Sequence, residues 1–169
     1  LYMAEKFKIV VMTLVMVTLY YVFTLALRPC IVVENDANIL YCFKLNADEE
    51  IALQYVHSVE KTVVIEKIGL VNNELCIKEM LYQSFGAGLP FLVQQGQFRI
   101  ENDWFIINDI NEKITAISLR VSKNSKLTIN YQGQAYDLYE LIPDNSVVNI
   151  KSARYYDIFI ADKIYRGIR

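Results

Sequence analysis

His57 is the single histidine of the chain, and it lies in the stretch YVHSVEKTVVIE at residues 55–66. Histidine near a carboxylate can transfer protons, bind a metal or bind a ligand. A tight turn around residues 59–61 would pair odd positions of one strand with even positions of the next. Tyr55, His57 and Glu66 would then face the same side of a sheet. Such a cluster either contacts another molecule or only stabilises the hairpin through a structural, hydrogen-bonded histidine.

His57 lacks the partners that a catalytic or metal site requires. A zinc site needs three or four nitrogen, sulfur or oxygen ligands, and the chain has no second histidine and no Cys-x-x-Cys. Ser58 is adjacent to His57, and adjacent strand residues point to opposite faces, so hydroxyl and imidazole diverge. No Gly-x-Ser-x-Gly, Ser-x-x-Lys or His-Glu-x-x-His motif occurs. These patterns argue against an enzyme, leave a hydrolase using His57 as the last-ranked function, and predict no metal or cofactor.

A second conspicuous stretch is SFGAGLP at residues 84–90. It is not a phosphate loop, because no lysine follows it and no helix is predicted there. Gly86 and Gly88 permit positive φ angles or close backbone approach, and Pro90 stiffens the exit. The stretch is either a sharp turn between sheets or a backbone surface that receives a ligand or a partner chain.

The elements that must position these residues are short β-strands. Apolar and polar residues alternate in most of them, and Asn, Gly, Pro and Asp mark the breaks. Many short strands at close spacing predict a compact antiparallel β-sandwich or barrel. The predicted strands are 31–35, 39–46, 50–58, 62–71, 74–84, 96–102, 104–109, 114–122, 126–131, 135–142, 147–152 and 155–165, with turns at 72–73, 124–125, 132–133 and 143–145.

The N-terminal part has a different character. Residues 9–27 form a run of 19 residues without a charge, long enough as a helix to span the roughly 30 Å hydrocarbon layer. Lys6 and Lys8 precede the run, which predicts a short cytoplasmic N-terminus at residues 1–8 and an exported remainder. A cleaved signal peptide is the alternative, but its apolar region is usually shorter. We therefore expect an uncleaved single-pass anchor at residues 9–27 and an extracytoplasmic all-β domain at residues 30–169.

Composition narrows the partners further. The net charge is -2, whereas a nucleic-acid surface is usually basic, so no nucleic-acid partner is expected.

Three cysteines, Cys30, Cys42 and Cys76, give an odd count. Cys42 and Cys76 would be able to pair in an exported domain, or all three would be small buried apolar residues.

The motifs Tyr55-x-His57-Ser58-Val59, Glu66 and Gly86-Ala87-Gly88-Leu89-Pro90 together resemble the DUF1850 family, a family of domains of unknown function. Tyr136-Asp137-Leu138 resembles its C-terminal part, and the resemblance covers most of residues 38–152. It implies a small membrane-anchored extracytoplasmic protein associated with TAXI-type TRAP transporters in bacteria. The resemblance implies location and association and no reaction, so His57, Ser58, Glu66 and the 86–90 segment are signature positions only.

Two functions of different classes follow. The first is an accessory protein of a TRAP transporter in the bacterial cytoplasmic membrane, contacting the membrane subunit or the substrate-binding protein. Its ligand or partner surface would comprise Tyr55, His57, Ser58, Glu66, Gly86, Gly88 and Pro90. The second is a stand-alone extracytoplasmic module that binds a small ligand or a metal ion.

Overall fold

The structure is a computed structural model of the 169-residue chain and describes residues 2–36, 38–84 and 96–158. The chain divides into two compact units, residues 1–29 with 153–169, and residues 30–152. The second unit contains almost all of the strands and holds the hydrophobic core.

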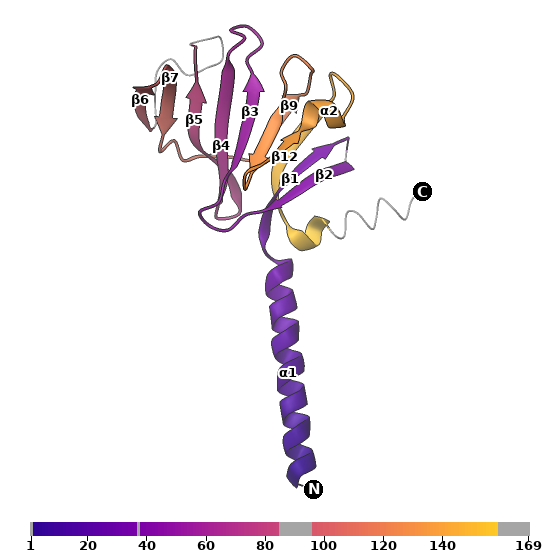
Figure 1. The fold of residues 1–169 in the computed structure, drawn as a ribbon. Helices are drawn as coiled ribbons and strands as arrows, with labels where there is room; N and C mark the ends of the chain where they lie inside the picture. Colours follow the sequence, from indigo (N-terminus) through magenta and orange to yellow (C-terminus); the bar gives the residue numbers. More distant parts are fainter. Residues whose placement is uncertain (1, 37, 85–95, 159–169) are drawn as a thin grey trace. The chain divides into compact units, whose positions relative to one another are not determined.

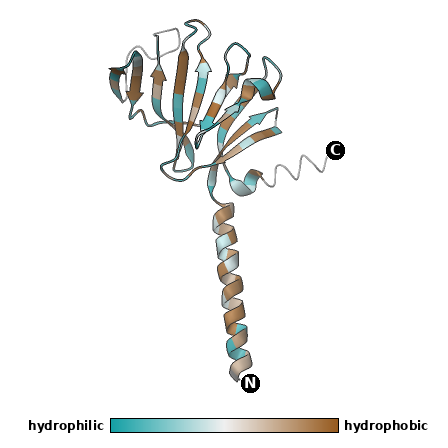
Figure 2. Cartoon of the chain, viewed as in Figure 1, coloured by the Kyte–Doolittle hydropathy of each residue, from teal (hydrophilic) through white to brown (hydrophobic). Residues whose placement is uncertain are grey.

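Helix α1 (Tyr2–Ala26) is the main element of the first unit (Figure 1). Its segment Met3–Ala26 has a mean hydropathy of 2.3 and no buried residue in its most apolar window, and Figure 2 shows apolar residues along most of its length. Three threonine hydroxyls donate to backbone carbonyls within the helix: Thr13 Oγ1 to Ile9 O (2.9 Å), Thr18 Oγ1 to Leu14 O (2.8 Å) and Thr24 Oγ1 to Tyr21 O (2.8 Å). Internal satisfaction of polar groups is what a helix in lipid requires. By length and composition, α1 is a candidate membrane span.

The described residues of the β-rich unit form two sheets (Figure 1). A four-stranded sheet has the order β2-β1-β12-β9, and a larger sheet has the order β11-β10-β3-β4-β5-β7-β6, with β8 also paired to β5. The pairs β1–β2, β9–β12, β3–β10, β10–β11, β3–β4, β4–β5, β5–β7, β5–β8 and β6–β7 are antiparallel. The elements are β1 (Pro29–Asn35), β2 (Asn38–Lys44), β3 (Ile51–Val56), β4 (Val63–Val71), β5 (Glu74–Tyr82), β6 (Gln97–Glu101), β7 (Trp104–Asn108), β8 (Glu112–Ile114), β9 (Ala116–Arg120), β10 (Thr128–Tyr131), β11 (Gln134–Asp137), α2 (Leu138–Leu141) and β12 (Val147–Arg154).

One core joins the two sheets. Alternating residues of β1, β2 and β12 from the smaller sheet meet residues of β3, β4, β5 and β10 from the larger sheet. The sheets do not close into a barrel, so the predicted all-β antiparallel fold is confirmed in its sandwich-like form. The buried members of this core are Ile31, Val33, Phe43, Leu45, Ile51, Leu53, Ile68, Leu75, Val121, Leu127, Ile129, Leu138, Val148 and Ile150.

Hairpin turns form where the sequence places Asn and Gly. Asn72 and Asn73 have φ angles of 54° and 65° between β4 and β5, and Gln132 and Gly133 have 49° and 79° between β10 and β11. Two consecutive positive φ angles are the geometry of the two-residue turn whose twist matches that of the flanking strands. Gly133 suits such a position because it has no Cβ. These turns fix the register of the strands on either side.

Three predicted strands differ from the structure. The run at 114–122 divides at Thr115, with β8 in the larger sheet and β9 in the smaller one. The run at 135–142 changes from β11 to the short helix α2, because Leu138 and Ile142 are one helical turn apart and both pack on the core. The strand predicted at 155–165 is wrong in its described part, because residues 155–158 are helical. Alternating polarity alone does not distinguish these cases from strands.

Candidate functional site

Tyr55 and Glu66 form a hydrogen-bonded pair on neighbouring strands. The register pairs Leu53 with Glu66 and Tyr55 with Val64, so Tyr55 and Glu66 lie diagonally on one face. The Tyr55 hydroxyl donates to Glu66 Oε1 at 2.8 Å. The structure thus brings together two of the residues that the sequence places on one side of the sheet.

Glu66 lies in apolar surroundings. It faces Leu53 on β3 and Met80 on β5, and its neighbours two residues away on the same face of β4 are the buried Val64 and Ile68. Burial raises the pKa of Glu66, and the hydrogen bond from Tyr55 opposes this only in part. Burial and the nearby carboxylate likewise raise the pKa of Tyr55. Within the described part of the chain, no ion pair is formed by Glu66.

Glu79 provides a contrast on the adjacent strand. It forms ion pairs with Lys67 and with Arg99, whose Nη2 is 3.6 Å from Glu79 Oε1. Lys67 lies directly opposite Glu79 in the ladder, so the charges compensate each other. The hydrogen bond from a neutral phenol to Glu66 is a weaker compensation than an ion pair, which leaves this carboxylate able to bind a proton or a positively charged group.

His57 bonds the backbone of the β3–β4 turn. Its Nδ1 accepts hydrogen bonds from the backbone N–H groups of Glu60 (3.2 Å) and Val59 (3.4 Å). The backbone N–H of His57 donates to the carbonyl of Thr62 at 2.8 Å, and the backbone carbonyl of His57 accepts from the N–H of Lys61 at 3.0 Å. Because Nδ1 is an acceptor, the neutral ring carries its proton on Nε2. The imidazole therefore defines the shape of the turn, which spans residues 58–61 and not only 59–61.

The tip of this turn is exposed and held in place from two sides. The apolar side chain of Val59 is 63% exposed. Ser58 is also exposed. Ser84, just after β5, donates from Oγ to Glu60 Oε2 at 2.8 Å, which joins the turn to the next strand. We call residues 57–61 the hairpin tip.

Sequence reasoning identified some of these positions and missed others. Val59 and Glu60 were not proposed as site residues, although they stand between His57 and Glu66 in the quoted stretch. In the sequence Ser84 is only the first residue of SFGAGLP, and its contact with Glu60 depends on strand pairing that spacing does not reveal. Gly86, Gly88 and Pro90 lie outside the described residues.

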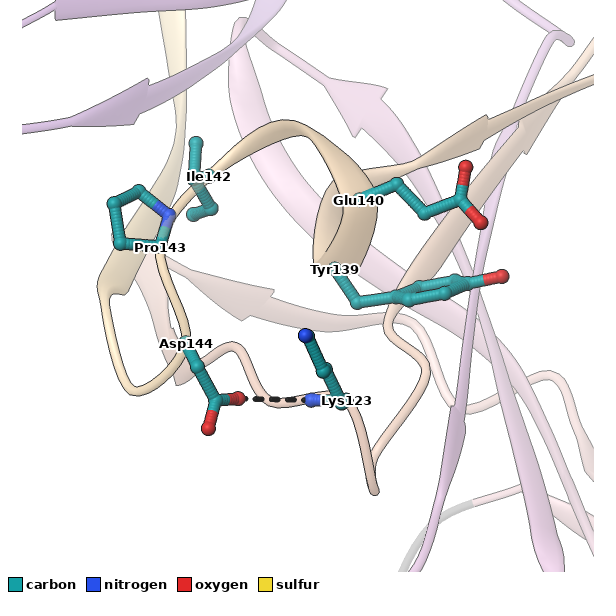
Figure 3. A pocket seen from close by; sticks show the side chains of 6 residues that line it. All are labelled: Lys123, Tyr139, Glu140, Ile142, Pro143 and Asp144. Carbon is teal, nitrogen blue, oxygen red and sulfur yellow. Dashed lines mark hydrogen bonds between the residues drawn. The ribbon is translucent and has the colours of Figure 1, made fainter.

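A separate open pocket lies beside α2 (Figure 3). Its volume is about 600 Å³, and it holds one cationic, two anionic and one phenolic side chain. The backbone N–H of Lys123 donates to Asp144 Oδ1 at 2.9 Å, which leaves the Lys123 ammonium pointing between α2 and the following loop (Figure 3). Its lining residues are Lys123, Tyr139, Glu140, Ile142, Pro143 and Asp144.

The described residues contain no group of three or more His, Cys, Asp or Glu side chains that could hold a metal ion. His57 in particular has Nδ1 engaged with two amides. The hairpin tip can act as an ordered contact surface for another molecule. The Tyr55–Glu66 pair can exchange a proton or bind a cation.

A family model, described as a domain of unknown function (DUF1850), matches residues 51–138. The match covers just over half of the chain and includes β3, β4 and the hairpin tip. The chain belongs to the DUF1850 family. Neither the curated proteins nor the solved structures include a significant match. The DUF1850 domain therefore contains the Tyr55–Glu66 pair, His57 and every strand of the larger sheet, whereas α1 and β12 lie outside the matched residues.

Proposed function

We propose that this DUF1850 protein is a membrane-anchored accessory protein of a solute transporter of the TRAP type, in its TAXI class. In this proposal α1 crosses the bacterial cytoplasmic membrane once and the β-domain lies outside the cytoplasm. The β-domain contacts the membrane subunit or the substrate-binding protein. The observation that carries the proposal is the apolar helix α1, whose most apolar window has no buried residue, in a chain that belongs to this family.

The exposed surface of α1 supports the membrane assignment. A helix that is apolar on all sides is stable in a lipid environment, where its backbone groups bond internally. Lys6 and Lys8 precede the apolar run and favour a cytoplasmic N-terminus. An anchored domain stays at a high local concentration beside a membrane partner, so a modest interface is sufficient.

The hairpin tip supports the choice of contact surface. It presents an exposed apolar side chain, Val59, on a turn whose shape is held by His57 and by Ser84. A turn that is already ordered loses little conformational entropy on binding, which favours association. His57 Nδ1 accepts two backbone bonds, so this role for the ring is one of contact geometry and not of catalysis.

Co-purification tests the proposal. The tagged full-length protein, extracted in mild detergent from membranes that contain the transporter, should retain the membrane subunit or the binding protein. Val59→Asp should lose the partner, because a charge replaces the apolar contact. Asn73→Asp adds the same charge at the exposed β4–β5 turn and should retain the partner. If the wild-type eluate contains neither transporter protein, the proposed association is wrong. If Val59→Asp retains the partner, the hairpin tip is not the contact surface.

The pocket beside α2 favours a second function, a stand-alone module that binds a small ligand. Lys123 provides a cation for a carboxylate, and Tyr139 provides a hydrogen-bonding phenol. A ligand that binds only the folded state raises the melting temperature by mass action. Organic acids and amino acids should then stabilise the wild type and not Lys123→Ala. If no compound of the panel raises the melting temperature of the wild type above that of Lys123→Ala, the ligand-binding function is wrong.

A further inference from the structure

The three cysteines are distributed unequally between the sheets. Cys30 is on β1 and Cys42 is on β2, both in the four-stranded sheet, whereas Cys76 is on β5 of the larger sheet. The pairing of Cys42 with Cys76 that the sequence allows would therefore join two different sheets. Cys30 is the cysteine that shares a strand pair with Cys42.

The register places Cys30 and Cys42 on the same face. Cys30 pairs with Lys44, and Val32 pairs with Cys42, so the two cysteines are diagonal neighbours across the β1–β2 ladder. Diagonal neighbours are usually about 7–8 Å apart at Cα and closer at Cβ, so a disulfide between them needs a small approach of the two strands. Twist shortens one of the two diagonals, and a bulge between Val33 and Glu34 adjoins the pair. A side-chain interaction with Cys30 is also the first cause of the lowered pKa of Cys42, as expected for thiols on one face of this ladder.

The two thiols differ in access and reactivity. Cys30 is 0% exposed, whereas Cys42 is only half-buried. The hydrogen bond from Cys30 lowers the pKa of Cys42, and the charge of Lys44 adds to this effect, while burial opposes it. A partly exposed thiol with a lowered pKa beside a buried second thiol is the usual arrangement of an attacking and a resolving cysteine.

We propose that Cys30 and Cys42 form a reversible disulfide that ties β1 to β2, by exchange with an oxidised dithiol carrier. The Cys42 thiolate attacks one sulfur of the carrier's disulfide, forms a mixed disulfide and releases the first carrier thiolate. Cys30 then loses its proton and attacks Cys42 Sγ, which expels the second carrier thiolate. The two protons and two electrons of the cysteine thiols thus leave with the carrier, which becomes a dithiol.

The position of this link gives it a structural effect. β2 is an edge strand of its sheet and bonds only to β1 on its path, and Cys30 is the first residue of the β-rich unit. A covalent bond between β1 and β2 closes the loop from Cys30 to Cys42 and restricts the unfolded chain. The oxidised domain is therefore more stable than the reduced one. This proposal does not depend on the association with a transporter.

The test uses the full-length protein in detergent, reduced and then incubated with oxidised glutathione. Thiol titration should fall from the three free cysteines to one, and digestion without reductant should yield a peptide linking Cys30 to Cys42. Cys76→Ala is the matched control and should form the same link. The oxidised wild type should melt roughly 5–10 °C above the reduced protein.

Single variants separate the roles of the two thiols. Cys30→Ala should accumulate a glutathione adduct on Cys42, because no resolving thiol is present, and Cys42→Ala should take none on the buried Cys30. A link from Cys42 to Cys76, a wild type that stops at the glutathione adduct, or a melting temperature that does not rise on oxidation would overturn the proposal. Because the wild type itself gives the deciding peptide map, a poorly folded variant does not affect the result.

Discussion

At the scale of single residues, His57 illustrates what its sequence position can and cannot predict. The parity of β3 and β4 follows from strand periodicity, so the sequence places Tyr55 and Glu66 on one face, as the register has them. The use of His57 Nδ1 by the amides of Val59 and Glu60 depends on the exact turn, which has four residues and not three. Spacing does not encode that detail.

Replacing His57 should reveal its role as a hydrogen-bond acceptor. His57→Ala removes the acceptor of two backbone N–H groups and should lower the free energy of unfolding by about 1 kcal/mol. His57→Asn places an oxygen where Nδ1 stands and should stay within about 0.5 kcal/mol of the wild type. Urea unfolding followed by the fluorescence of Trp104, the single tryptophan, measures both. Equal losses in the two variants would show that the ring acts through other contacts.

Glu66 should make stability depend on pH. Its folded-state pKa is raised above the ordinary value of 4.5, so the folded protein holds the proton more tightly than the unfolded chain. Stability is then highest below the ordinary value and decreases as pH rises through the folded-state pKa. Glu66→Gln cannot ionise, so its urea midpoint should change less over this range and should equal or exceed that of the wild type at pH 7. An unchanged pH slope in this variant would contradict the assignment.

At the scale of elements, an aromatic cluster joins one edge of each sheet. Phe43 on β2 contacts Tyr136 on β11 and Tyr131 on β10, with edge-to-face ring centroids 5.1 and 5.3 Å apart. The strands and most turns could be predicted from alternation and turn residues. The change of sheet at Thr115 and the helix α2 could not, because both depend on which sheet or core surface each segment meets.

Removing the central ring of this cluster should be costly. Phe43 is 4% exposed, so Phe43→Ala should lower the free energy of unfolding by about 3–5 kcal/mol through lost burial and the cavity left behind. Leu141→Ala, at a position that is 51% exposed, is the matched control and should cost less than about 0.5 kcal/mol. The same urea titration compares the two. A loss below about 1 kcal/mol in Phe43→Ala would mean that the two edges are held together by other contacts.

At the scale of the whole molecule, α1 and the β-domain have separate roles in the proposal. The sequence could predict α1, because a long uncharged run is a strong signal by itself. It could not identify the hairpin tip as the proposed contact surface, since the exposure of Val59 and the contact from Ser84 to Glu60 appear only in the folded chain.

The protein extracted from membranes should retain α1. An uncleaved anchor predicts that the intact mass includes residues 9–27 and that alkaline carbonate does not release the protein, because the apolar run stays in the hydrocarbon layer. Mass spectrometry of the carbonate-washed membrane fraction measures this. A mature protein that begins after residue 27 would instead identify the run as a cleaved signal.

Site-specific photo-crosslinking at Val59 tests the central claim most directly. A photoreactive amino acid at position 59, in cells that contain the transporter, should give an adduct with the membrane subunit or the substrate-binding protein. The same probe at Asn73, on the exposed β4–β5 turn, should give none. A probe at position 59 that yields no transporter adduct, or equal adducts from both positions, would contradict the account.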